Sequence, residues 1–149
     1  MPSKKLIRDR AQLTIVLAIV KNEQNQVLIA RRNDETLPTA HNKWELIGGR
    51  LEWDESPEEA LVREVKEESG LDVAVTRLLP KVFHNYWTQV DGTQFKVILI
   101  PFECKLLGGE LHTSGFDHKI GELKFVDFQD IDQYDFLPLD PAIIKLAYA

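Results

Sequence analysis

One stretch of the sequence, residues 56–70, carries the marks of a helix at both of its ends. Ser56 is a good N-cap residue, Pro57 suits the first helical position, and Glu59 completes an S-x-x-E capping box. Gly70 stands where a helix of this length needs a left-handed residue to end it. The sequence therefore predicts a helix between these two ends.

The predicted helix has two distinct faces. Its aliphatic residues form an apolar stripe that can pack on a core: Leu61, Val62 and Val65. Its carboxylates at spacing i, i+3, i+4 share another face: Glu64, Glu67 and Glu68. These like charges repel, and two of them lie near the negative end of the helix dipole. Two interpretations are open: an acidic surface softened by Arg63 and Lys66, or a seat for a hard divalent cation.

The residues around this helix match a longer pattern, G-x5-E-x7-R-E-U-x-E-E-x-G-U with U aliphatic, over residues 49–71. Every fixed position is met: Gly49, Glu55, Arg63, Glu64, Glu67, Glu68 and Gly70, with Val65 and Leu71 as the aliphatic residues. The pattern resembles the signature of the Nudix hydrolases, which cleave nucleoside diphosphates linked to another moiety. Weaker similarity to the MutT-like branch of that family extends over most of the chain.

Composition narrows the class of protein. A chain of 149 residues is enough for one domain with a real core, so we expect residues 1–149 to form a single Nudix domain. No apolar run is long enough to span a membrane, and Cys104 is the only cysteine, so we expect a cytoplasmic protein. The net charge of -6 argues against non-specific nucleic-acid binding, although metal ions would still let the protein bind a polyphosphate.

Aliphatic and alternating stretches predict seven strands, at residues 11–20, 27–31, 44–47, 72–77, 81–90, 93–104 and 123–128. Gly48 and Gly49 predict a tight turn ahead of the helix, and Asp91-Gly92 predicts a two-residue hairpin loop. A short closing helix is expected at residues 141–148. Strands before and after a helix predict an α+β fold with a mixed sheet flanked by helices. This agrees with the α/β/α sandwich that the resemblance implies.

A pyrophosphate bond is cleaved when its charge is neutralised and a water is placed in line with it. The resemblance implies Mg2+ as the cofactor, with Mn2+ as a substitute, and four ligands: Glu67, Glu68, the carbonyl of Gly48, and Glu64 as a third carboxylate or as the group that orients the water. Arg63 would hold the carboxylates and Glu55 would brace Arg63. Arg63 also has the spacing for an ordinary helical ion pair with Glu59 or Glu67.

The general base stays open between Glu64 and the loop of residues 116–122. MutT-like enzymes often supply a further glutamate from this loop, but its expected position falls on Lys119. The alternatives within the loop are Asp117, His118 and Glu122. A lone histidine in a loop is more often a surface residue than a catalyst.

The candidates for substrate binding are Arg32, Asp140 and Tyr86. Arg31 and Arg32 end a strand on opposite faces, and the resemblance favours Arg32 for the phosphates. Asp140 lies in a tail that resembles the base-reading segment of MutT-like enzymes, and it is equally a helix-cap candidate. The stretch Phe83, His84, Tyr86 and Trp87 offers rings that would stack on a base or simply belong to the core.

We expect hydrolysis of a nucleoside triphosphate to the monophosphate and pyrophosphate. Alternatives are hydrolysis of ADP-ribose, for which the usual proline is absent from residues 81–100, or of dinucleoside polyphosphates, which Tyr86 keeps open. A non-catalytic nucleotide-binding module is a third reading, although none of the signature carboxylates is lost. The expected partner is a small nucleotide, with neither nucleic acid nor membrane, and strand-rich segments would allow a homodimer.

Overall fold

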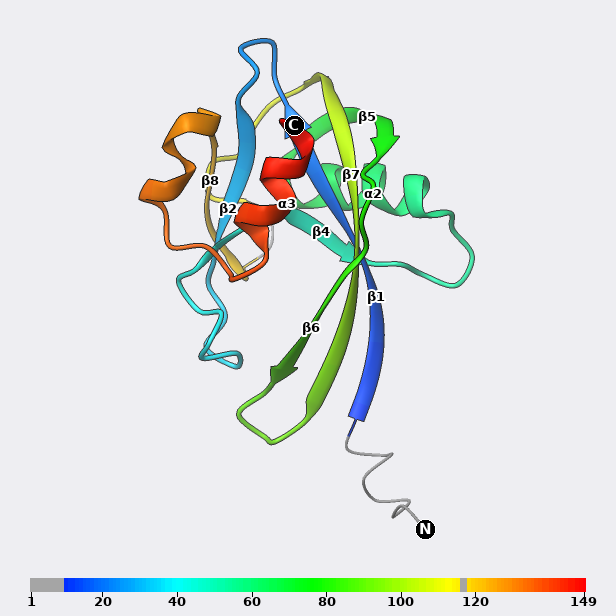
Figure 1. The fold of residues 1–149 in the computed structure, drawn as a ribbon, viewed down its shortest axis with the longest axis vertical. Coiled ribbons are helices and arrows are strands. Elements are labelled where there is room, and N and C mark those ends of the chain that lie inside the picture. The colour runs from blue at the N-terminus through cyan, green and yellow to red at the C-terminus, as the bar shows by residue number, and fades with distance from the viewer. Residues whose placement is uncertain (1–9, 116–117) are drawn as a thin grey trace.

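The computed structural model describes residues 10–115 and 118–149, which have an α+β fold (Figure 1). Its strands are β1 (Arg10–Lys21), β2 (Val27–Arg32), β3 (Trp44–Glu45), β4 (Ile47–Arg50), β5 (Leu71–Leu78), β6 (Phe83–Thr88), β7 (Gln94–Gly109) and β8 (Ile120–Val126). Its helices are α2 (Pro57–Ser69), the 3-10 helix η1 (Phe128–Gln133) and α3 (Asp140–Ala147). The predicted fold class is confirmed.

Two long strands, β1 and β7, form the centre of one mixed sheet. They run parallel, from the pair Arg10↔Gln94 to the pair Lys21↔Lys105. The other edge of β1 pairs with β4 and, at its end, with β2, while the other edge of β7 pairs with β5 and then β6. The strand order along the main path is β3-β2-β1-β7-β5.

Alternation along β1 divides the apolar residues between two cores. Val16, Ala18 and Val20 pack with the buried residues of α2, whereas Leu17 and Ile19 pack with those of α3. This period of two is what a strand buried on both faces requires. Helices therefore cover the two faces of the sheet, as in the predicted sandwich (Figure 1). None of the helices in the described residues is long and apolar enough to cross a membrane.

Helix α2 has the ends that the sequence predicts. The Ser56 side chain accepts from the Glu59 backbone N–H, and the Glu59 carboxylate accepts from the Ser56 N–H in return. Gly70 ends the helix in the left-handed region, with φ of 84°. The apolar stripe is only partly as predicted, because Leu61 and Val65 are buried but Val62 is 40% exposed.

Three expectations about strands are corrected. The strand expected at residues 44–47 is two strands, because β3 pairs with β2 whereas β4 pairs with β1. The hairpin after β6 has a loop longer than two residues, closed by a hydrogen bond from the Gln89 N–H to the Thr93 carbonyl at 2.9 Å. The last strand ends at Val126 rather than at residue 128, and the chain continues into η1.

Candidate active site

Gly48 and Gly49 lie inside β4 and not in the tight turn that the sequence suggested. Their lack of side chains serves close approach instead. A Cβ atom at Gly48 would lie 2.1 Å from the Val16 carbonyl oxygen, and one at Gly49 would lie 2.2 Å from the Glu64 carboxyl carbon. The two glycines therefore bring β4 against β1 on one side and against the carboxylate of Glu64 on the other.

Arg63 holds three carboxylates at this point. Its Nε and Nη2 donate to the two oxygens of Glu55 at 2.9 and 2.6 Å, a bidentate pair. Its Nη1 donates to Glu64 at 2.9 Å and to Glu67 at 3.2 Å. The pKa of Arg63 is raised by these partners, and its hydrogen bonds lower the pKa of Glu55. Arg63 thus fixes the side chains that the sequence assigns to the site.

Glu64 and Glu68 share a polar contact on the face of α2 that meets β4. The pKa of Glu64 is raised, mainly because the side chain is buried and also because Glu67 is near. Hydrogen bonds with Arg63 and with the Glu68 side chain act in the opposite direction. A hydrogen bond between two carboxyl groups requires a shared proton, and a cation between them would serve in its place. Glu67 points outward and its side chain is 59% exposed.

Beside these carboxylates lies a small cavity of about 110 Å³, which we call the Gly48 cavity. It is lined by Ala30, Arg32, Glu45, Leu46, Ile47, Gly48, Glu68, Lys119 and Ile120. The cavity unites Gly48 and Glu68, two of the predicted metal ligands, with Arg32, a predicted substrate contact. The elements that meet around it are β2, β3, β4, α2 and the start of β8.

Arg32 is held in the wall of the Gly48 cavity by a residue that the sequence analysis did not single out. Its Nε and Nη2 donate to the Glu45 carboxylate at 2.5 and 2.8 Å, and its Nη1 lies 3.6 Å from Asp34. The pKa of Arg32 is raised because Glu45 outweighs the effect of burial, while burial raises the pKa of Glu45. Arg31 points away, to Asn42 and across Gly121, as the alternation of the strand predicts.

Asp140 does not cap α3. It is the first residue of that helix, its side chain makes no capping hydrogen bond, and Leu139 precedes it as the N-cap. Its Oδ2 instead accepts from the backbone N–H of Leu46 at 2.9 Å. Asp140 is 5% exposed, and burial raises its pKa to about 8. The cap interpretation is therefore wrong, and the carboxyl group ties α3 to the wall of the Gly48 cavity.

The loop before β8 does not bring a described carboxylate to the site. Lys119 lines the Gly48 cavity, whereas Glu122 lies in β8 with its side chain 3.6 Å from Lys124. The carbonyl of His118 accepts from the side chain of Asn33 at 3.2 Å. Asp117 lies outside the described residues.

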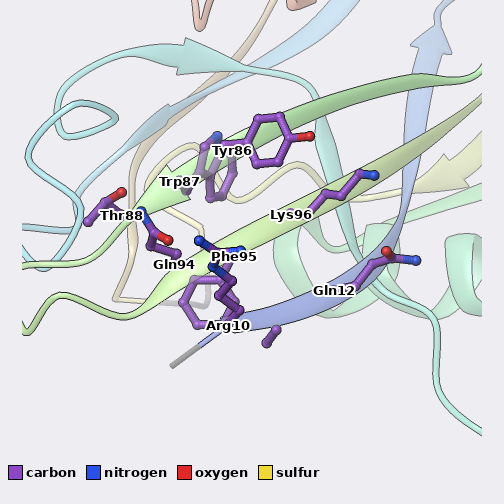
Figure 2. Close-up of a pocket in the computed structure, with 9 residues that line it drawn as sticks. Arg10, Gln12, Tyr86, Trp87, Thr88, Gln94, Phe95 and Lys96 are labelled. Atoms are coloured by element: carbon purple, nitrogen blue, oxygen red, sulfur yellow. The ribbon is translucent and has the colours of Figure 1, made fainter. Parts of the chain in front are cut away.

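Tyr86 lies in a different place from the box carboxylates. Tyr86 is 65% exposed and lines a groove of about 670 Å³ that shares no residue with the Gly48 cavity. The residues that line this groove are Arg10, Ala11, Gln12, Tyr86, Trp87, Thr88, Gln94, Phe95 and Lys96, from three neighbouring strands (Figure 2). Trp87 also lines this groove, and its ring lies 5.4 Å from the guanidinium of Arg32, which lines the Gly48 cavity.

The NUDIX domain family matches residues 12–146 of the chain. The chain belongs to the Nudix family. An 8-oxo-dGTP diphosphatase of Proteus vulgaris is 38% identical over 78 residues, which are 52% of this chain and 68% of that protein. The nucleoside triphosphatase NudI of Escherichia fergusonii is 29% identical over 129 residues, 83% of this chain and 88% of the relative. The match to another relative, the 8-oxo-dGTP diphosphatase of Escherichia coli K12, covers only 57% of that protein's length.

A solved structure of similar shape is that of the MutT protein from Methanosarcina mazei Go1. It has a TM-score of 0.72 and 25% identity, over 91% of this chain and 92% of that one. The resemblance drawn from the Nudix signature is confirmed, and the chain is a Nudix pyrophosphohydrolase.

The Nudix signature found the carboxylates but not their surroundings. One feature of the sequence could have pointed to Glu45 as a site residue: it is a charged residue between Trp44 and Leu46 in an apolar stretch. Spacing in the sequence could not predict that Lys119 lies in the cavity wall, because this depends on the pairing of Lys119 and Ile120 with the end of β2.

Proposed function

We propose that this Nudix hydrolase cleaves a nucleoside triphosphate to the monophosphate and pyrophosphate. The observation that carries the proposal is that Glu64, packed against Gly49, contacts Glu68, which lines the Gly48 cavity together with Gly48 itself. The names of the relatives, 8-oxo-dGTP diphosphatase and nucleoside triphosphatase, support a triphosphate as the substrate.

The donor set fits a hard divalent cation such as Mg2+, with Mn2+ as a substitute. Within residues 10–115 and 118–149 no three acidic, histidine or cysteine side chains converge to hold an ion, since Glu67 points outward. The carboxyl groups of Glu64 and Glu68 do meet beside Gly48, and carboxylate and carbonyl oxygens are the ligands that Mg2+ takes. We therefore assign the metal to Glu64, Glu68 and the Gly48 carbonyl; Glu67, the further ligand that the signature implies, would join them by turning its exposed side chain inward. When bound, the ion would neutralise charge on the phosphoryl oxygens.

Glu64 is our candidate for the group that orients the attacking water and accepts its proton. It is half-buried and held by Arg63, and Arg63 is braced by Glu55. Water would attack one phosphorus of the α,β-anhydride and pass its proton to Glu64. The bond from that phosphorus to the bridging oxygen would break, which releases the monophosphate and pyrophosphate. The loop before β8 offers a cation, Lys119, at the expected position of a further glutamate, which supports Glu64 for the role.

The base of the nucleotide would lie on the other side of Arg32, toward Asp140 and Trp87. Asp140 is joined to the backbone of Leu46 in the cavity wall, and the Trp87 ring lies over Arg32. A small nucleotide is thus the proposed partner, in a single Nudix domain. The single, buried Cys104 supports a cytoplasmic location.

The test is a panel of nucleoside triphosphates, ADP-ribose and a dinucleoside polyphosphate, incubated with and without Mg2+ and assayed for pyrophosphate. We expect pyrophosphate from a triphosphate only when Mg2+ is present. Glu68→Gln should lower kcat by about 100-fold or more, since it removes a charged ligand. Glu58→Gln is the matched control, because Glu58 is exposed in the first turn of the same helix and should leave kcat unchanged.

Other products would point to another reaction. Ribose 5-phosphate and AMP from ADP-ribose, with no turnover of triphosphates, would replace the proposal by the ADP-ribose alternative. Equal loss of activity in Glu58→Gln and Glu68→Gln would remove the assigned metal site. Tight nucleotide binding without any product would favour the non-catalytic module.

A further inference from the structure

The Gly48 cavity contains a lysine where the resemblance leads one to expect a carboxylate. Lys119 lines the cavity together with Glu68 and Gly48, and its side chain is 51% exposed. Its backbone is fixed, because its carbonyl accepts from the Asn33 N–H at 2.6 Å and the next residue, Ile120, pairs with Arg32 in the sheet. The lysine is therefore anchored at the cavity while its long side chain can still change direction.

The two cations of the cavity differ in how firmly they are held. Arg32 makes a bidentate pair with Glu45 inside the cavity wall. If Arg32 moved away, the buried carboxylate of Glu45 would lose this partner, which is costly. The Nζ of Lys119 lies 3.9 Å from Asp34, which also accepts from Thr36 and lies near Arg32. That ion pair is long, and the Lys119 side chain is half exposed, so solvent screens it. Lys119 therefore presents an ammonium group at the cavity that a bound anion can reach.

The size of the cavity restricts which anion enters it. Its volume is about 110 Å³, well above the roughly 10–15 Å³ that one water needs, so the space has room for a phosphoryl group. Pockets that enclose whole drug-sized ligands measure about 300–1,000 Å³. The cavity therefore fits part of a polyphosphate chain and leaves the base and sugar outside.

We propose that Lys119 binds the polyphosphate chain of the substrate directly, with its Nζ donating to a non-bridging phosphate oxygen. The proposal rests on the proposed function and adds a residue to its site. A compact ammonium group at this position supplies positive charge of its own, so part of the affinity for phosphate does not depend on a metal ion.

The experiment measures binding of inorganic pyrophosphate and of dGTP to the full chain by calorimetry, in EDTA and in Mg2+. Lys119→Met should raise Kd for both ligands about tenfold in EDTA, while Lys119→Arg should restore most of the affinity. Lys105→Met is the matched control, because Lys105 is exposed on β7 and does not line the cavity, so Kd should change less than twofold. In turnover, KM should rise about tenfold in Lys119→Met with kcat within about threefold.

Three outcomes would overturn the proposal. One is an unchanged Kd for pyrophosphate in Lys119→Met, and another is an equal loss in Lys105→Met, which would reflect overall charge. A third is a fall in the melting temperature of Lys119→Met that accounts for the weaker binding. Loss of pyrophosphate binding in Lys119→Met without turnover of any triphosphate would support the phosphate contact and overturn the proposed reaction instead.

Discussion

At the scale of single residues, Gly49 joins the fold to the chemistry, because the carboxylate of Glu64 occupies the space that a side chain would fill. In Gly49→Ala the new Cβ would lie 2.2 Å from the Glu64 carboxyl carbon, so the carboxylate must move away from Gly48 and Arg63. We expect kcat to fall by about 100-fold, the scale of losing a positioned group. Steady-state kinetics at saturating Mg2+ would measure this.

Gly108→Ala provides the control for this prediction. A Cβ at Gly108 would meet no atom within 4 Å, and its φ is not in the left-handed region. The variant should keep its activity and stability. Unchanged kcat in Gly49→Ala would mean that Glu64 acts from a different position.

Asp140 gives the protein a dependence of stability on pH. Its pKa is about 8 in the folded chain, against about 3.9 in an unfolded one, so between these values the folded state keeps a proton that the unfolded state has lost. The free energy of unfolding should therefore fall as pH rises from about 4 to about 8, by up to about 1.4 kcal/mol per unit. Below that window, the contribution is fully present.

Asp140→Asn separates this effect from those of other groups. The amide oxygen can still accept from the Leu46 N–H, but the side chain no longer titrates. Urea unfolding at several pH values should show a shallower slope in the variant than in the parent chain. Identical slopes would contradict the assignment of the dependence to Asp140.

At the scale of elements, sequence predicted what local signals determine. Helix α2 has the expected cap at Ser56 and the expected end at Gly70, since both depend on bonds within the helix. The strands β1 and β2 follow from their aliphatic residues alone. Helix α2 carries most of the residues of the Nudix signature, so the sequence alone predicted much of the candidate site.

Elements that depend on distant partners were predicted less well. The break between β3 and β4 exists because Glu45 pairs with Ala30 of β2, whereas Ile47 pairs with Ala18 of β1. The role of Gly48 and Gly49 was misread as a turn for the same reason, since the carbonyl of Val16 and the side chain of Glu64 come from elsewhere in the chain. Spacing within one segment carries no record of such neighbours.

At the scale of the whole molecule, the end of α3 is tied to the two central strands of the sheet. The Nζ of Lys21 donates to the Ala147 carbonyl at 2.6 Å and to Glu103 of β7 at 2.9 Å, and it lies 4.2 Å from the Tyr148 ring. The Tyr148 hydroxyl donates to the Asn25 carbonyl at 2.7 Å. One lysine thus joins β1, β7 and the C-terminal segment.

Lys21→Met should therefore weaken the fold without touching the chemistry. The substitution leaves Glu103 and the Ala147 carbonyl without this donor, so we expect the free energy of unfolding to fall by about 1–2 kcal/mol and the melting temperature by about 2–8 °C.

Lys43→Met is the control, because Lys43 pairs with Asp135, whose side chain is 74% exposed, and such a pair contributes about 0–1 kcal/mol. Calorimetry would compare the two, with kcat at 25 °C as the second measurement. Since neither Lys21 nor Lys43 lines the Gly48 cavity, kcat should be unchanged in both variants. A matching fall in kcat would instead mean that anchoring α3 also positions Asp140 against Leu46.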